Sequence, residues 1–147
     1  MEQRPVEDLN ILVVDDDKDT RERLSNILTR RGYKVFLAED GIEGLELARH
    51  NVIDVIFCDL IMPHMDGLEF LSKIREYTLK AEVIIVSGLP TVEALAESVE
   101  KNVVEFLIKP LTIEDIFISL NKAKKRLQDK RTTFNSALSR MRLNQIL

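Results

Sequence analysis

Five short apolar runs, each followed by a segment with helical spacing, constrain the fold of this chain more than any other feature. The runs occupy residues 9–14, 33–38, 52–58, 83–86 and 103–108. A continuous apolar run between turn residues is typical of a strand that is buried on both faces. Strands that alternate with helices through short connections predict parallel pairing with right-handed crossovers. We therefore expect an α/β fold with a doubly wound, five-stranded parallel sheet.

The strand order that we expect is 2-1-3-4-5, the flavodoxin-like order. Helix-end signals agree with this division of the chain. Asp19 and Thr20 can cap the first helix, and Gly32 can end it. Asn102 is an acceptable left-handed terminator for the fourth helix. Thr112 can cap the fifth helix in a loose capping box, because Asp stands three residues later where Glu or Gln is usual.

Charge divides the chain into an acidic body and a basic tail. Residues 1–121 hold 13 Lys and Arg against 24 Asp and Glu, whereas residues 122–147 hold eight against one. We predict one domain over residues 1–127, followed by a basic helical tail or linker over residues 128–147. The tail is too short for a winged or helix-turn-helix output module. Its apolar period is unfinished at residue 147, so a fragment of a longer protein is one of the alternatives that the sequence leaves open. The acidic body argues against nucleic-acid binding by the domain itself.

The sequence favours a cytoplasmic protein without a membrane span. Its N-terminus lacks the apolar stretch of a signal peptide, and no apolar run reaches the length of a transmembrane helix. The single cysteine, Cys58, lies within an apolar run, where it is most simply a small buried side chain. One cysteine also excludes an internal disulfide framework, which suits a reducing compartment.

Polar side chains follow four of the five expected strands. Asp15 and Asp16 follow the first strand, Asp59 the third, Ser87 the fourth and Lys109 the fifth. Because ligands of open parallel sheets bind beyond the carboxyl ends of the strands, we expect these residues to meet in one crevice. Two carboxylates about 5 Å apart repel each other by roughly 3 kcal/mol at an effective dielectric constant near 20, so the cluster needs a cation.

The chemistry that this group suits is phosphoryl transfer. Oxygen ligands with room for water favour Mg²⁺ over Zn²⁺. A lysine and a hydroxyl beside a metal-held carboxylate can neutralise and bind phosphoryl oxygens. The carboxylate can itself be the nucleophile, and Asp59 is the candidate because it ends the longest apolar strand. Asp17, His50 and His64 are better explained as a capping or loop acid and two surface histidines.

An ordered set of motifs closely resembles the receiver domain of two-component response regulators. The segments are ILVVDDD at 11–17, DLIMPHMDG at 59–67, SG at 87–88 and FLIKP at 106–110. The resemblance covers roughly residues 8–127. It implies that Asp59 is the phosphoacceptor, loaded from a phosphohistidine. It also implies that Asp16, Asp59 and the backbone carbonyl of Ile61 bind Mg²⁺ directly, while Asp15 acts through water.

The resemblance assigns further roles to residues at the ends of the fourth and fifth strands. Lys109 would contact the phosphoryl group, and Ser87 would move to it after transfer. Phe106 would be an aromatic switch that turns inward, and the Lys109–Pro110 peptide bond would be cis. The face formed by the fourth helix, fifth strand and fifth helix would respond. A domain of this kind catalyses only its own phosphorylation and dephosphorylation and is not a conventional enzyme.

The implied partner is a sensor histidine kinase or a phosphotransfer protein, with a homodimer as a second possibility. Leu120, Leu127, Phe134 and Met141 recur every seven residues, which predicts a weak coiled coil. Pairing could use this fifth helix and tail, or the face named above. A normal last helix with a frayed basic tail is the alternative.

Two other functions remain open at this point. One is an adaptor that binds partners without phosphorylation, although the full set of site residues argues against it. The other is a phosphatase of the haloacid dehalogenase type, which needs a second Asp where Ile61 stands. Ile61 and Leu89 also motivate a hypothesis about lifetime, because apolar side chains flanking the site would hinder an attacking water. We predict a long-lived aspartyl phosphate.

Overall fold

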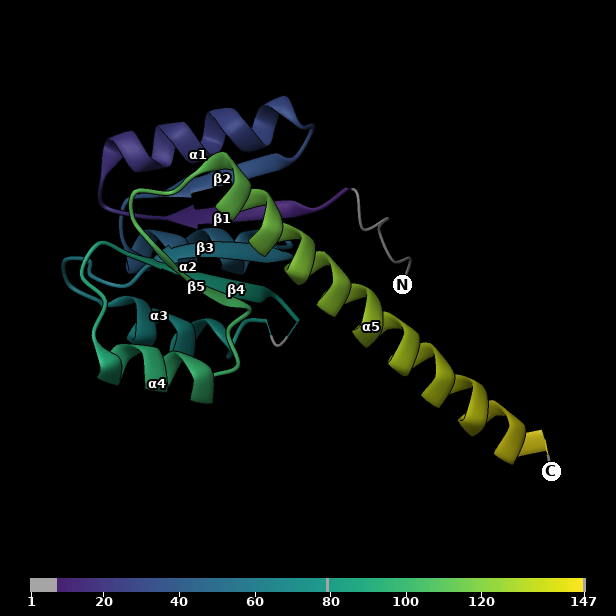
Figure 1. Ribbon diagram of the computed structural model, residues 1–147. Coiled ribbons are helices and arrows are strands. Elements are labelled where there is room, and N and C mark those ends of the chain that lie inside the picture. Colours follow the sequence, from purple (N-terminus) through teal and green to yellow (C-terminus); the bar gives the residue numbers. More distant parts are fainter. Residues whose placement is uncertain (1–7, 79, 147) are drawn as a thin grey trace.

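The chain folds into a parallel sheet with helices on both faces and one helix that runs far beyond the sheet (Figure 1). The computed structural model describes residues 8–78 and 80–146. The elements, in chain order, are β1 (Asn10–Val14), α1 (Lys18–Arg30), β2 (Lys34–Ala38), α2 (Gly41–His50), β3 (Val55–Asp59), α3 (Gly67–Ile74), β4 (Glu82–Ser87), α4 (Val92–Glu100), β5 (Glu105–Ile108) and α5 (Ile113–Ile146).

The predicted fold class and strand order are confirmed. The five strands are parallel and follow the order β2-β1-β3-β4-β5. β1 and β3 are therefore neighbours, with Val14 opposite Cys58, although α1, β2 and α2 separate them in the sequence. The strands β1, β3 and β4 are almost wholly buried, as their uninterrupted apolar runs predicted.

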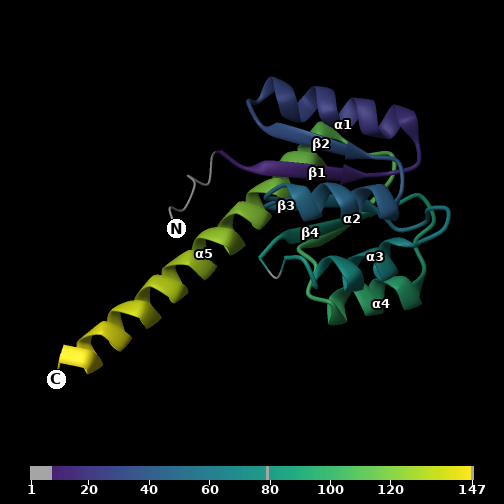
Figure 2. The same cartoon turned by 180° about the vertical axis from the view of Figure 1, so that it is seen from behind.

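Two apolar clusters hold the helices to the sheet, one on each face. The first lies under α2, α3 and α4 and includes Ile56, Phe70 and Ile74. The second lies under α1 and α5 and includes Leu28 and Leu120. Figure 2 shows α2, α3 and α4 on one side of the sheet, while α5 leaves from the other side.

Capping residues set most helix ends as expected, with one correction. Asp17, not Asp19 or Thr20, is the N-cap of α1, and its carboxylate accepts a hydrogen bond from the Thr20 hydroxyl at 2.6 Å. The expected caps lie two and three residues too late in the sequence, whereas Asp17, which we interpreted as a capping or loop acid, has the extended backbone of an N-cap residue. Gly32 and Asn102 both have positive φ, as predicted for helix terminators.

The tail does not fray within the described residues. α5 is a single helix of 34 residues, so the extended-helix form of the prediction is confirmed. Its first turns pack on the sheet, whereas Phe134, Met141 and Leu143 are more than half exposed.

Candidate functional site

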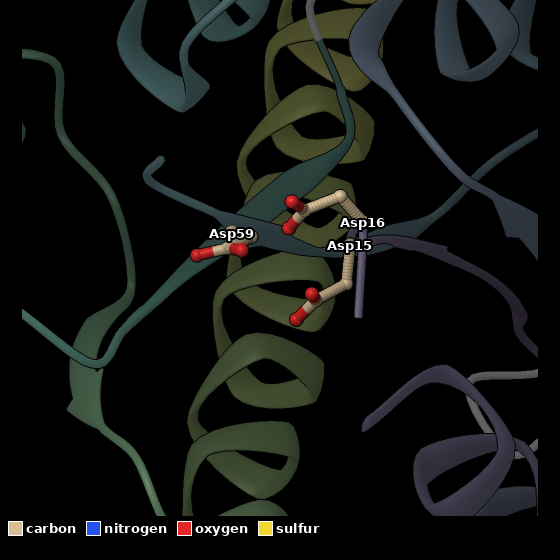
Figure 3. Close-up of side chains that lie close together, drawn as sticks. All are labelled: Asp15, Asp16 and Asp59. Carbon is tan, nitrogen blue, oxygen red and sulfur yellow. The ribbon is translucent and has the colours of Figure 1, made fainter. Parts of the chain in front are cut away.

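The site lies at the carboxyl ends of β1 and β3. Asp59 is the last residue of β3, and Asp15 and Asp16 directly follow β1. Since the two strands pair in parallel, their ends deliver these carboxylates to the same edge of the sheet. The three side chains gather beside one another, with Asp15 and Asp16 adjacent and Asp59 across from them (Figure 3).

The three carboxylates could together hold a metal ion. One oxygen from each of Asp15, Asp16 and Asp59 lies within 4.8 Å of the others. Asp15 and Asp59 are buried, whereas Asp16 is exposed, so the cluster has both fixed oxygens and access to water. An all-oxygen donor set of this kind suits a hard divalent cation such as Mg²⁺ or Ca²⁺ rather than Zn²⁺.

Lys109 brings a positive charge to the same cluster from the end of β5. Its Nζ lies 2.8 Å from Oδ2 of Asp15 and 3.4 Å from Oδ2 of Asp59. Burial lowers the pKa of Lys109, but the hydrogen bonds and charges of Asp15 and Asp59 outweigh it, so the pKa is raised. Lys109 is therefore a fixed cation that contacts two of the three acids.

Asp59 has the most perturbed carboxyl group of the site. Burial and the negative charge of Asp15 raise its pKa from 3.8 to about 7, and a hydrogen bond with Asp16 adds to this. The charge of Lys109 and the N–H of Ile61, 3.4 Å from Oδ1, act in the opposite direction. A cation added to the cluster would favour the ionised form that a nucleophile or ligand requires.

Ser87 and the end of β5 border the cluster. Ser87 is fully buried, and its hydroxyl oxygen accepts a hydrogen bond from the N–H of Leu89 at 3.1 Å. The Lys109 N–H donates to the carbonyl of Ser87 at 2.8 Å, which ties the two strand ends together. The Lys109–Pro110 peptide bond is cis, as the resemblance implied. Phe106 is partly buried and packs against the apolar cluster that lies under α2, α3 and α4.

The loop between β3 and α3 passes very close to Asp59. A Cβ atom at Gly67 would lie 2.4 Å from the Asp59 carbonyl oxygen, so only glycine fits at this position. The Gly67 N–H donates to the Leu60 carbonyl at 2.7 Å, which closes the loop. Ile61 within this loop and Leu89 after β4 are 54% and 71% exposed, so both predicted flanking side chains are open to solvent.

The sequence did not reveal every residue that supports the site. Arg21 donates a hydrogen bond from its guanidinium to the Asp15 carbonyl at 2.7 Å. Nothing in the local pattern marks Arg21, because its role depends on how α1 is rotated over the sheet. The two histidines lie elsewhere, as expected: His50 pairs with Glu46 on α2, and His64 is an exposed loop residue.

A cavity of about 340 Å³ opens beside Lys109 on the α1 side of the site. It is lined by residues of α1 and of the connection from β5 to α5, namely Asp17, Thr20, Arg23, Leu24, Lys109, Pro110, Leu111 and Ile116. Lys109 is the residue that this cavity shares with the acidic cluster, and Asp15, Asp16 and Asp59 do not line it.

Comparison with known proteins identifies the family. Residues 11–121 match the model of the response regulator receiver domain. The chain belongs to this family. The receiver domain is 35% identical over 117 residues to the transcriptional regulatory protein ZraR of Klebsiella oxytoca. That match covers 80% of the chain but only 26% of ZraR, so the chain spans about a quarter of the length of this relative.

Solved structures agree with the fold of the receiver domain. A CheY-like receiver domain protein from Methanospirillum hungatei superposes with a TM-score of 0.80 at 24% identity, covering 84% of this chain and 98% of that one. A response regulator from Burkholderia pseudomallei, solved with a phosphorylated aspartic acid and a calcium ion, gives 0.73 at 26% identity, covering 87% and 75%. Within the described part of the receiver domain, no helix is both long enough and apolar enough to cross a bilayer.

Proposed function

We propose that this receiver domain accepts a phosphoryl group on Asp59 from a phosphohistidine of a sensor kinase or phosphotransfer protein, in a Mg²⁺-dependent reaction in the cytoplasm. The observation that carries the proposal is the position of Lys109, whose ammonium contacts both Asp15 and Asp59 beside the three-carboxylate cluster. The phosphorylated aspartic acid of the Burkholderia pseudomallei structure supports the same chemistry.

In this reaction an Asp59 carboxylate oxygen attacks phosphorus, the bond from phosphorus to the imidazole nitrogen breaks, and the imidazole leaves. Lys109 neutralises charge on the phosphoryl oxygens from a position that is already fixed. Asp16, Asp59 and the Ile61 carbonyl would hold Mg²⁺ directly, with Asp15 acting through water. When bound, the ion offsets the repulsion among the carboxylates and the phosphoryl oxygens.

Switching follows from the charge that the phosphoryl group adds, about −1.5 to −2. The Ser87 hydroxyl accepts a hydrogen bond from the Leu89 N–H, which leaves its own proton free to donate to a phosphoryl oxygen. Movement of Ser87 would open space for Phe106 to turn inward. Reversing a 1:99 equilibrium needs roughly 5.5 kcal/mol, which contacts to Lys109, Ser87 and the ion would supply together.

The surface that we propose to respond is the α4–β5–α5 face. Apolar side chains of all three elements are about half exposed or more on this face: Val92, Leu95, Val99, Ile108 and Ile113. Exposed apolar groups of this kind fit a partner or a second copy of the chain. Because ZraR is a transcriptional regulatory protein, a separate output domain beyond residues 128–147 is the partner that we propose, with residues 1–127 forming the receiver.

Incubation with acetyl phosphate and Mg²⁺, followed by intact-mass measurement, tests the proposal. The wild-type chain should gain the mass of one phosphoryl group, and Asp59→Asn should gain none. Asp129→Asn, a matched change on the exposed part of α5, should be phosphorylated like the wild type. An unmodified wild-type chain would indicate an adaptor, and continuous release of phosphate without a stable adduct would indicate a phosphatase. Either result would overturn the proposal.

A further inference from the structure

A second buried carboxylate lies at the opposite end of β4 from Ser87. Glu82 is the first residue of this strand and is 1% exposed. At about 3.3 Å per residue, it lies roughly 17 Å from Ser87 and therefore outside the phosphorylation site. A glutamate that is this deeply buried needs positive partners, because an unpaired buried charge is strongly unfavourable.

Two of the positive partners of Glu82 come from α5, and the charge of Arg75 at the end of α3 also acts on it. The Arg126 guanidinium lies 3.5 Å from Oε2, and the Lys130 ammonium forms an ion pair with Oε1. The two basic residues are four apart, so they occupy the same face of the helix on successive turns. Arg126 also donates to the carbonyl of Asn102 at 3.0 Å, which ties the same turn to the end of α4.

These contacts lie where α5 leaves the body of the domain. The apolar side chains that hold α5 to the sheet end with Leu127, which is 7% exposed. Beyond Lys130, Phe134 is 57% and Met141 is 60% exposed. In both ribbon views, the helix beyond this point runs away from the sheet (Figures 1 and 2).

We propose that Glu82 is a positioning residue that fixes the direction in which α5 leaves the domain. Apolar packing is not directional, whereas two ion pairs on successive turns restrict both the tilt and the rotation of the helix. The 16 residues that follow Lys130, up to Ile146, extend about 24 Å at 1.5 Å per residue. A tilt of about 20° at Lys130 would therefore move the end of the helix by roughly 8 Å.

Other charged contacts along α5 are weaker candidates for this role. Lys122 pairs with Glu105, but the side chain of Glu105 is 31% exposed, whereas that of Glu82 is 2% exposed. The two lysines are similarly exposed, Lys122 at 55% and Lys130 at 47%. Arg31 lies 4.3 Å from the ring centre of Phe117, and Lys124 lies 4.7 Å from that of Tyr33, both nearer to the start of the helix. Exposed pairs contribute little to structure, so Glu105 offers a matched control.

The test measures the direction of the helix by electron–electron distance spectroscopy on the full chain. Nitroxide labels on cysteines introduced at the exposed positions Asn26 and Ser139 report the distance from α1 to the extension. The native Cys58 is fully buried and should take no label, which the unsubstituted chain verifies. Labelled protein is diluted into an excess of unlabelled protein, so that only distances within one chain contribute. The chain is kept unphosphorylated, so failure of the proposed phosphorylation would not affect the result.

We expect one narrow distance distribution for the wild type and at least a twofold broader one for Glu82→Gln. Glu105→Gln should keep the wild-type width. Should Glu82→Gln fail to fold, Lys130→Ala should broaden the distribution, and Lys130→Arg, which retains the charge, should preserve it. A Glu82→Gln distribution as narrow as the wild type, or equal broadening by Glu105→Gln, would overturn the proposal.

Discussion

At the residue scale, Asp59 combines two properties that oppose each other. Burial and the charge of Asp15 raise its pKa to about 7, whereas its proposed chemistry requires the ionised form. Lys109 and the Ile61 N–H lower the pKa of Asp59, but by less than burial and Asp15 raise it. The ionised form of Asp59 is therefore unfavourable in the metal-free domain, and a bound cation would relieve this, which couples occupancy of the site to stability.

This coupling predicts that Asp59→Asn stabilises the metal-free domain at pH 8 but not at pH 4. Between 3.8 and about 7 the folded state retains a proton that the unfolded state has lost, so wild-type stability falls as the pH rises. Asparagine does not titrate and removes this loss. Each pKa unit corresponds to about 1.36 kcal/mol, and the shift from 3.8 to about 7 already includes the attraction of Lys109, so we expect a gain in the free energy of unfolding of roughly 4 kcal/mol at most. Urea unfolding in the presence of a chelator, at pH 8 and at pH 4, measures this difference in the free energy of unfolding between the variant and the wild type.

The control for this experiment is Asp129→Asn, which lies on the exposed part of α5 and should leave both unfolding curves unchanged. A destabilised Asp59→Asn variant at pH 8 would show that Asp59 is held mainly by its attraction to Lys109.

The apolar residues that flank the site lead to a second prediction. Ile61 and Leu89 are exposed beside Asp59 and Ser87, where they would hinder water that attacks the phosphoryl group. We expect the double change Ile61→Asn and Leu89→Glu to speed loss of the phosphoryl group by about tenfold, or 1.4 kcal/mol in barrier height. The decay is followed by intact mass after removal of acetyl phosphate. An unchanged decay rate would contradict the role of these side chains.

The site residues at the carboxyl ends of strands were predictable from the sequence, whereas Arg21 on α1 and Glu82 at the amino end of β4 were not. Asp15, Asp59 and Lys109 each end an apolar run, so their convergence follows from the order of parallel strands. Arg21 and Glu82 act through contacts between helices and the sheet. Those contacts depend on the tilt and rotation of each helix, which arise from packing of the whole core rather than from a local pattern.

At the element scale, a capping side chain marks the residue at which each helix begins. α5 begins with a reciprocal capping box in which the Asp115 N–H donates to the Thr112 hydroxyl at 3.0 Å, and the Thr112 N–H donates to the Asp115 carboxylate at 3.3 Å. The sequence predicted this box only loosely, since Asp replaces Glu or Gln. The Asp115 side chain, although shorter than that of Glu or Gln, still reaches the Thr112 N–H, so the predicted capping box is confirmed.

Loss of this cap should be measurable as a loss of stability. Thr112→Ala removes the acceptor for the Asp115 N–H at the start of a helix whose residues Ile116 and Leu120 are fully buried. We expect the free energy of unfolding to fall by about 1 kcal/mol in chemical denaturation. Thr132→Ala, on the exposed extension of the same helix, is the matched control and should change it by less than about 0.5 kcal/mol. Equal losses in both variants would exclude a specific capping effect.

At the scale of the whole molecule, α5 carries one apolar stripe across two environments. Leu120 and Leu127 are buried against the sheet, and Phe134 and Met141 continue the same seven-residue repeat on the exposed extension. Lys130 lies between the two halves and pairs with Glu82. The repeat was visible in the sequence, but the boundary between its buried and exposed halves was not, because it depends on where the body of the domain ends.

The exposed half of the stripe predicts self-association of the chain. Two helices that pair through Phe134 and Met141 would bury apolar side chains worth roughly 1.5–3 kcal/mol each when fully covered. We expect the double change Phe134→Ser and Met141→Ser to weaken dimerisation at least tenfold in sedimentation equilibrium, a loss of about 1.4 kcal/mol or more. Ser136→Ala lies on the opposite side of the helix and should leave the dimer unchanged. A wild-type chain that stays monomeric at every concentration would show that the stripe serves a different partner, and dimers of equal strength in the double variant would place the contact on the α4–β5–α5 face instead.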